Sequence, residues 1–211
     1  LALPEARFTV NAVLDLLECP PIARRLDVGA ADRDLLRAWA EKAAIHWGLD
    51  GTDKARFDLP PLSTHTWRRG LDRLLLGTVL PEDSQALYGD MAPVEAVEGA
   101  LFPLLGRLAA WVDDLQADHA RLAVPRTPTV WAEDLLAVLD GLFSAIPEEE
   151  GGLLRLRAAI QAVAADATVA ACDLSIPQAV FLAALEERLS TPGAGGGFLA
   201  GGVQFCAMVP L

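Results

Sequence analysis

Apolar side chains recur every three or four residues along most of the chain, which is the spacing of one face of an α-helix. In the stretch "ADRDLLRAWAEKAAIHW", for example, one apolar stripe is formed by Leu35, Leu36, Trp39, Ala43 and Trp47. Seven stretches follow this pattern, at residues 8–18, 31–47, 65–77, 103–122, 127–146, 152–172 and 175–189. The pattern therefore predicts a mainly α protein, built as an array of about seven helices.

Several of these stretches begin with residues that stabilise the first turn of a helix. Thr9 stands where its hydroxyl can accept a hydrogen bond from a first-turn N–H group, and Ser175 with Gln178 has the spacing of a capping box. Pro103 is expected in a first turn, because a proline inside a helix costs about 3 kcal/mol. These residues predict where three of the helices begin.

Proline, glycine and aspartate residues separate the helical stretches. The prolines at 20–21 end the first helix and start a short turn, and residues 48–64 and 81–93 read as long loops. The break between the two halves of the chain suggests two packing units. We expect residues 8–80 and 100–190 to form separate sub-bundles of the helical array.

The end of the chain follows a different pattern. In "VQFCAMV", residues 203–209, apolar residues occupy both faces of an extended chain, which is typical of a strand buried in an α/β sheet. We therefore expect residues 1–197 to form the helical domain and residues 198–211 to begin the next, α/β domain. Because an unpaired apolar strand exposes backbone donors and acceptors, this strand should pair with residues 1–8 or with another copy of the chain.

Length and composition limit the size class of the protein and the compartment in which it is expected. The chain has 211 residues, enough for one large domain or two small ones. It contains no uninterrupted apolar stretch of about 18 residues, the length that indicates a membrane span. The first residues lack the basic and apolar segments of a signal peptide, and the three cysteines match no metal or redox spacing. These features predict a cytoplasmic protein with reduced thiols.

The formal net charge of the chain is −12 at pH 7. A protein that binds DNA by itself usually carries a basic stripe, because neutralising phosphate groups supplies most of the non-specific affinity. We therefore expect the isolated chain to bind DNA weakly or not at all.

Motifs for catalysis, for metals and for cofactors are missing from the sequence. His46, His65 and His119 all lack the glutamate three residues earlier that a di-metal carboxylate centre requires. The glycine-rich "GAGGGF" at 193–198 follows a predicted helix and precedes the predicted strand, the reverse of the order around a phosphate-binding loop. We expect no catalytic residue, no metal and no cofactor in this chain.

One local basic cluster stands out, formed by Arg68, Arg69 and Arg73 beside Trp67. It has two interpretations. The arginines could contact DNA or a protein partner. Alternatively, Arg68 pairs with Asp72 one helical turn later on the solvent face while Trp67 packs inward. Both interpretations remain open from the sequence alone.

Four stretches together resemble successive landmarks of the RecC family. They are "VLDLLECPPIARRL" (13–26), "IHWGLDG" (45–51), "TWRRGLDRLLLG" (66–77) and "FLAGGVQFCAMVPL" (198–211), and their order and approximate spacing match the family. The third stretch is the most distinctive. RecC is the gamma subunit of exodeoxyribonuclease V, the RecBCD helicase–nuclease.

The resemblance implies a fold and a role. RecC is similar to a superfamily 1 helicase that has lost its ATPase motifs, followed by a nuclease-like domain that has lost its catalytic residues. This segment would be the helical, 2B-type insertion of the second helicase-like half, and residues 198–211 would return to the helicase-like core. The implied function is that of a non-catalytic scaffold that acts with RecB and RecD in double-strand-break repair by homologous recombination, and that meets DNA only through the complex.

A second hypothesis comes from a different class of protein. The chain could be a self-standing helical bundle that binds a ligand or acts as an enzyme on an unknown substrate. Such a bundle needs several polar groups that converge in a pocket. The sequence offers no paired cluster of titratable residues, so this hypothesis is the weaker of the two.

Overall fold

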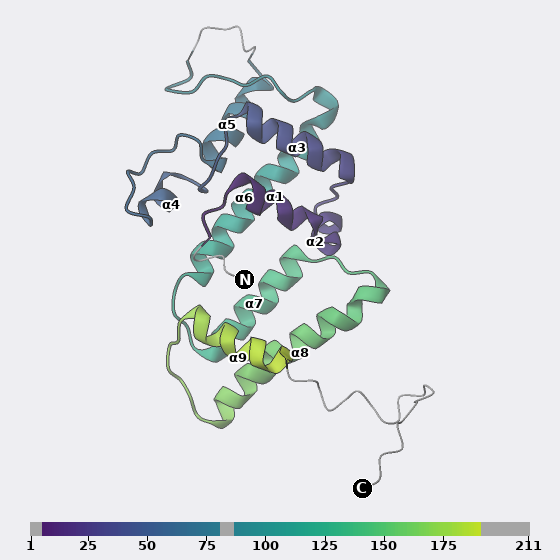
Figure 1. Ribbon diagram of the computed structural model, residues 1–211, viewed down its shortest axis with the longest axis vertical. Helices are drawn as coiled ribbons and strands as arrows, with labels where there is room; N and C mark the ends of the chain where they lie inside the picture. Colours follow the sequence, from purple (N-terminus) through teal and green to yellow (C-terminus); the bar gives the residue numbers. More distant parts are fainter. Residues whose placement is uncertain (1–5, 81–86, 191–211) are drawn as a thin grey trace, which may run out of the picture.

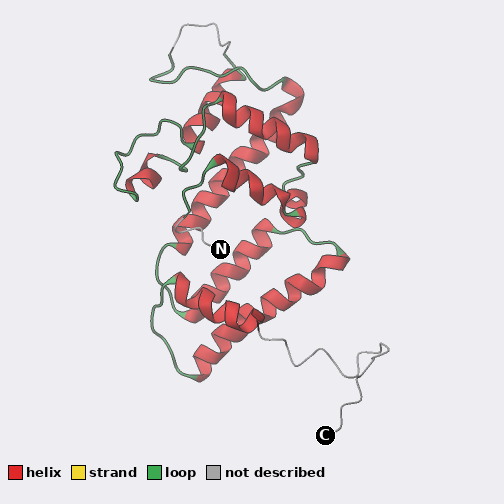
Figure 2. Ribbon diagram, viewed as in Figure 1, coloured by secondary structure: helices red, strands yellow, loops and turns green. Residues whose placement is uncertain are grey.

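The computed structural model describes residues 6–80 and 87–190, which form nine α-helices and two short 3-10 helices (Figures 1 and 2). Isolated bridges at Tyr88–Met91 and Arg126–Ile176 are the only β pairing in these two ranges. The helices are α1 (Val10–Asp15), α2 (Pro20–Arg25), α3 (Ala30–Lys42), α4 (Gly51–Ala55), α5 (Trp67–Gly77), α6 (Phe102–Leu122), α7 (Pro128–Leu142), α8 (Pro147–Val169) and α9 (Gln178–Ser190), with 3-10 helices at Leu16–Glu18 and Gly99–Leu101.

The predicted mainly α fold is confirmed, and each of the seven predicted helical stretches contains a helix. The two remaining helices, α2 and α4, are short and were predicted as a turn and as loop. Helix α2 begins with Pro20 and Pro21, because a proline at the first helical positions needs no N–H partner. In α4, Asp50 caps the helix by accepting a hydrogen bond of 2.8 Å from the backbone of Asp53.

The predicted helix starts had different outcomes. Thr9 caps α1, since its hydroxyl accepts from the Ala12 N–H at 3.3 Å, and Pro103 lies in the first turn of α6. The predicted cap at Ser175 is wrong, because α9 begins only at Gln178. The backbone of Ile176 pairs instead with that of Arg126, through two hydrogen bonds of 2.8 and 3.1 Å. The predicted strand at 203–209 and its pairing with 1–8 lie outside the described residues.

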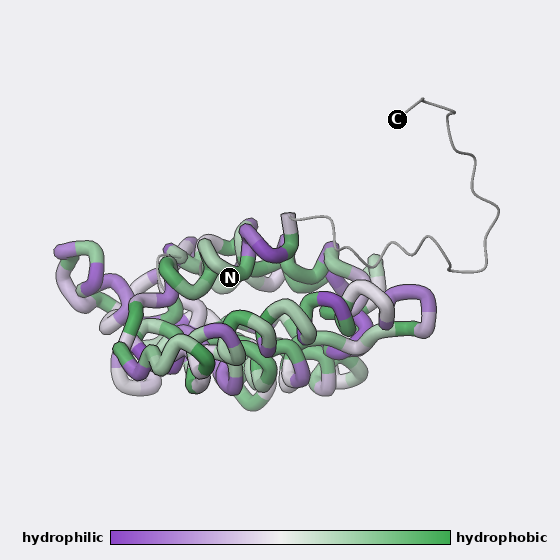
Figure 3. The backbone as a smooth tube through the Cα atoms, turned by 90° about the horizontal axis from the view of Figure 1, so that it is seen from below, coloured by the Kyte–Doolittle hydropathy of each residue, from purple (hydrophilic) through white to green (hydrophobic). Residues whose placement is uncertain are grey.

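Buried apolar side chains form two clusters. The first unites α1, α3, α5 and most of α6, with Trp67 and Trp111 almost completely buried in it. The second unites the end of α6 with α7, α8 and α9 around Trp131 and Phe181. Figure 1 shows the two groups of helices at opposite ends of the molecule, with α6 running between them. In Figure 3 the same body is seen from below, with apolar and polar residues alternating along its helices.

Helix α2 and an apolar cavity lie where the two clusters meet. Arg25 of α2 donates to the Gly141 carbonyl of α7 at 2.9 Å, and the Ser144 N–H donates to the Pro21 carbonyl at 3.0 Å. Beside this junction is a cavity of about 200 Å³, lined only by apolar side chains, among them Trp111 and Leu139. The predicted division into sub-bundles 8–80 and 100–190 stays a prediction.

The long connection between α3 and α5 is held by buried polar contacts. Asp53 is 6% exposed, and its carboxylate accepts from the Leu49 N–H at 3.0 Å and from Arg56 Nε at 2.8 Å. The buried Lys54 ammonium donates to the Thr64 carbonyl and lies 5.1 Å from the centroid of the Trp47 ring. Since buried polar groups are costly when unpaired, these contacts fix the path of the connection.

None of the helices in the described ranges has the length and apolar character that crossing a membrane requires.

Candidate functional site

Helix α5 carries all four residues of the predicted basic cluster. Thr66 caps this helix by accepting from the Arg69 N–H at 3.3 Å. Trp67, the first helical residue, is completely buried, and its Nε1 donates to the Phe8 carbonyl at 2.9 Å. The prediction that Trp67 packs inward is confirmed. The tryptophan therefore anchors α5 to the N-terminal segment.

Arg68 points from α5 toward α6. Its guanidinium forms an ion pair with Asp113, and both side chains remain about half exposed. The structure therefore places Arg68 against a carboxylate of another helix, whereas the sequence had suggested Asp72 one turn along α5. An exposed ion pair of this kind stabilises a protein by about 0–1 kcal/mol. Its larger effect is that the guanidinium charge of Arg68 is already paired within the chain.

Arg69 and Arg73 point toward the last residues of the second predicted loop, around 90–92. Arg69 Nη1 lies 2.8 Å from a carboxylate oxygen of Asp90, and this hydrogen bond holds the pKa of Asp90 below its usual 3.8. Arg73 donates to the Ala92 carbonyl at 3.0 Å and to the Ala43 carbonyl at 2.9 Å. The two arginines therefore fasten the segment around residues 90–92 to α5 and to the end of α3.

The structure thus brings only part of the predicted cluster together. Arg69 and Arg73 line one pocket of about 400 Å³ with His65 and Asp90, while Arg68 faces α6. Each guanidinium already has a carboxylate or carbonyl partner within the chain. A phosphate or partner carboxylate at this site would have to compete with those partners. The contacts that occupy the arginines are long-range, and no local sequence signal could have shown them.

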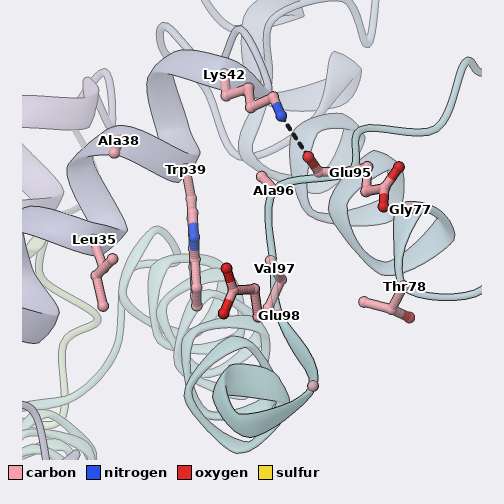
Figure 4. A pocket seen from close by; sticks show the side chains of 11 residues that line it. Leu35, Ala38, Trp39, Lys42, Gly77, Thr78, Glu95, Ala96, Val97 and Glu98 are labelled. Carbon is pink, nitrogen blue, oxygen red and sulfur yellow. Dashed lines mark hydrogen bonds between the residues drawn. The ribbon is translucent and has the colours of Figure 1, made fainter. Parts of the chain in front are cut away.

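A second candidate site, missed by the sequence reasoning, is an open cleft of about 680 Å³ between α3, the end of α5 and residues 94–99 (Figure 4). Segment 94–99 crosses α5 at Gly77, where a Cβ atom would lie 2.1 Å from the Val94 carbonyl oxygen. Only glycine allows this close approach. The apolar wall of the cleft comes from α3, with Leu35 and Trp39 one turn apart.

Polar contacts fix the other wall of the cleft. The Val94 N–H donates to the Arg73 carbonyl at 3.0 Å, and the Lys42 ammonium donates to the Glu95 carbonyl. Val97 is 8% exposed and belongs to the first hydrophobic cluster. The segment is therefore held in one position by α3 and α5 although it is not helical.

Histidine, cysteine and acidic side chains are the groups that could hold a metal ion. In residues 6–80 and 87–190, the acidic, histidine and cysteine side chains form no group of three that could bind a metal ion. His46 and His65 stack face to face with their ring centroids 4.3 Å apart, and His65 Nδ1 lies 2.8 Å from the Ala44 carbonyl. This pair joins the beginning and the end of the long connection between α3 and α5.

In the described residues, the fold and the two sites define a mainly α-helical domain with two hydrophobic clusters, a polar pocket beside α5 and an open cleft beside α3. Comparison with known proteins assigns the domain more closely. The chain belongs to the family of the fourth domain of the RecBCD enzyme subunit RecC, whose family model matches residues 1–193.

Individual relatives agree with the family match. Over all 211 residues the chain is 30% identical to RecC of Escherichia coli (strain K12) and 30% identical to RecC of Mycolicibacterium smegmatis. The identity to RecC of Mycobacterium tuberculosis (strain H37Rv) is 29%. The chain covers 19% of the length of each of these relatives. The predicted resemblance to RecC is confirmed for a segment of that subunit.

Proposed function

We propose that this domain is a non-catalytic scaffold segment of RecC, acting in the RecBCD helicase–nuclease during double-strand-break repair by homologous recombination. The family match over residues 1–193 carries this proposal. The geometry of α5 supports it, because the arginines of the basic cluster hold helices and connections of the same chain together. In this role the partners are the RecB and RecD subunits, in the cytoplasm, and DNA is met through the complex.

Within RecC, we place the domain as the helical, 2B-type insertion of the second helicase-like half. Its mainly α fold is what such an insertion requires. In this assignment residues 198–211 lead back into the helicase-like α/β core. The sequence of the full subunit on both sides of these 211 residues tests the assignment, because it should show strand–loop–helix patterns of a helicase core.

The alternative, a self-standing ligand-binding or enzymatic bundle, has less support. The cavity between the two hydrophobic clusters has only apolar lining residues. It therefore lacks the few convergent polar groups that orient a substrate. In the polar pocket beside α5, the guanidinium groups of Arg69 and Arg73 are already held by Asp90 and by backbone carbonyls.

The proposal is tested in the full-length subunit, co-expressed with RecB and RecD. Replacing Trp67 by Ala removes a completely buried side chain, which costs about 3–5 kcal/mol. We expect the yield of assembled complex to fall, while ATPase and nuclease activity per assembled complex stay unchanged. Leu154→Ala is the control, because Leu154 is 64% exposed and its loss should leave assembly intact. Normal assembly with Trp67→Ala, or normal assembly with lost activity, would contradict a scaffold role.

A further inference from the structure

The open cleft between α3, the end of α5 and residues 94–99 has the features of a peptide-binding groove (Figure 4). We propose that it receives an extended, basic segment of a partner subunit. This inference deepens the scaffold role and rests on it. Three features of the cleft carry it: its apolar wall, an unpaired stretch of backbone and an acidic rim.

The apolar wall on α3 offers the half-buried Leu35 and the exposed Ala38 to an occupant. Leu35 and Trp39 of α3 face Val97 across the cleft (Figure 4). The volume of about 680 Å³ lies within the roughly 300–1,000 Å³ of ligand sites in proteins. Trp39 and Val97 are already buried, so a bound segment would cover mainly Leu35 and Ala38. Removing this apolar surface from water favours association.

The wall opposite α3 is a fixed stretch of backbone at Ala96 and Val97 that is free to pair with another chain. The described residues supply no hydrogen-bond partner for the N–H and C=O groups of Ala96 and Val97. On the N-terminal side of this stretch, the Val94 N–H donates to the Arg73 carbonyl and Lys42 donates to the Glu95 carbonyl. On the C-terminal side, Glu98 has extended dihedral angles of φ −78° and ψ 153°. An extended peptide can pair its own backbone with such a fixed edge, as in strand addition.

The acidic rim of the cleft favours an occupant with positive charge. Glu98 is exposed at the mouth of the cleft, and its carboxylate lies beside the Trp39 ring, whereas Lys42 on the same rim is already held by Glu95 (Figure 4). In the described ranges, no ion pair engages Glu98. The chain as a whole also carries a net charge of −12 at pH 7. A nucleic-acid phosphate would be repelled here, whereas a lysine or arginine on an extended polypeptide would be attracted.

A photo-crosslinking amino acid identifies the occupant. We place p-benzoylphenylalanine at Ala38, an exposed residue of the cleft, in the full-length subunit assembled with RecB and RecD. The same probe at Ala179, exposed on α9, is the matched control. We expect irradiation to join the Ala38 probe, and not the Ala179 probe, to a lysine- or arginine-containing segment of RecB or RecD, located by mass spectrometry. A crosslink to DNA, to another part of the same subunit, or to nothing would overturn the proposal.

A charge reversal tests the acidic rim. Glu98→Lys should lower the crosslinking yield from Ala38 roughly fivefold, because an attractive exposed pair becomes repulsive. Glu186→Lys on the exposed face of α9 changes the net charge equally and should leave the yield unchanged. Both variants replace exposed residues, and thermal melting confirms that they fold. An equal yield in all three proteins would overturn the acidic-rim argument.

Co-purification separates this inference from the function on which it rests. If the subunit fails to assemble with RecB and RecD even without substitutions, the scaffold role is wrong. If it assembles and the Ala38 probe finds no partner subunit, only the cleft assignment is wrong.

Discussion

Gly70 and Gly77 lie where α5 passes closest to its neighbours. A Cβ atom at Gly70 would lie 2.1 Å from Ile45 Cγ1, and one at Gly77 would meet the Val94 carbonyl. Both residues lie inside a helix or at its end, where glycine is otherwise unfavourable by about 1 kcal/mol relative to alanine. The close contacts therefore explain why alanine, the better helix former, is not used.

We predict that Gly70→Ala destabilises the domain by about 1–3 kcal/mol, because overpacking against Ile45 outweighs the gain in helix propensity. Gly106→Ala is the matched control. Gly106 lies in α6 with open space around its Cα, so the same substitution should stabilise by roughly 0.5–1 kcal/mol. Urea denaturation of the two variants gives both free energies of unfolding. A destabilised Gly106→Ala would show that the open space at that position is misjudged.

Asp118 gives the stability of the domain a dependence on pH. Burial raises its pKa above the usual 3.8, opposed by Arg121 and reinforced by the charges of Asp114 and Asp134. A raised pKa in the folded state means that this carboxyl stabilises the fold below pH 3.8, and that the contribution is lost as pH rises through the folded pKa.

Asp118→Asn removes this titration while keeping the shape of the side chain. We expect the variant to be more stable than the original chain at pH 7. The difference in free energy of unfolding should shrink as the pH is lowered toward 3.8. Thermal unfolding monitored by circular dichroism between pH 3 and pH 7 measures it. A difference that grows on acidification would show the opposite sign of the shift.

Among the helices, α6 and α8 are similar in length but differ in burial. Helix α6 has 21 residues, of which eight are buried, whereas α8 has 23 residues and only Ile160 is buried. Helix α9 adds only Phe181 and Leu185 to the second cluster. Elements with few buried contacts open more readily than the rest of a fold.

We therefore predict that the amides of α8 and α9 exchange with solvent before those of α5 and α6. Native-state hydrogen exchange, read by mass spectrometry on peptides from each helix, measures the order. The α6 amides serve as the internal reference. Protection in α8 equal to that in α6 would mean that the second cluster is as stable as the first.

Local periodicity was sufficient to locate seven of the nine described helices but not their contacts. The apolar stripe of α3 and the cap at Thr9 are encoded within a few neighbouring residues. Helix α4 has only five residues, and the polar contacts of Asp50 and Asp53 hold it in place, so no periodic pattern could reveal it. The Ser175 cap failed because Ile176 pairs with Arg126, far away in the sequence.

The candidate site shows the same limit. The sequence pointed to the arginines of α5 because they are adjacent to one another. Their partners Asp113 and Asp90 come from other parts of the chain and depend on how the helices pack. The cleft itself is formed by α3, α5 and an irregular segment, and its unpaired Ala96 backbone has no sequence signature.

At the scale of the whole molecule, charge governs encounters with nucleic acid. With a net charge of −12, the isolated chain should bind duplex and single-stranded DNA more weakly than about 10⁻⁴ M at physiological salt. Fluorescence anisotropy with labelled oligonucleotides measures this. Residual binding should disappear when Arg68, Arg69 and Arg73 are all replaced by Ala, and persist when they are replaced by Lys. Tight binding that survives the alanine replacements in a folded protein would contradict the argument from charge.

Helix α6 is the one described helix with buried side chains in both hydrophobic clusters. At 1.5 Å per residue its 21 residues span roughly 30 Å, so it acts as a strut between the two ends of the domain. The apolar cavity beside it leaves fewer atoms in contact across the junction than a filled core would. The domain is therefore stiff to a pull along α6, and a load applied at the cleft would reach α7 and α9 by two routes, through this helix and through the hydrogen bonds between α2 and the end of α7.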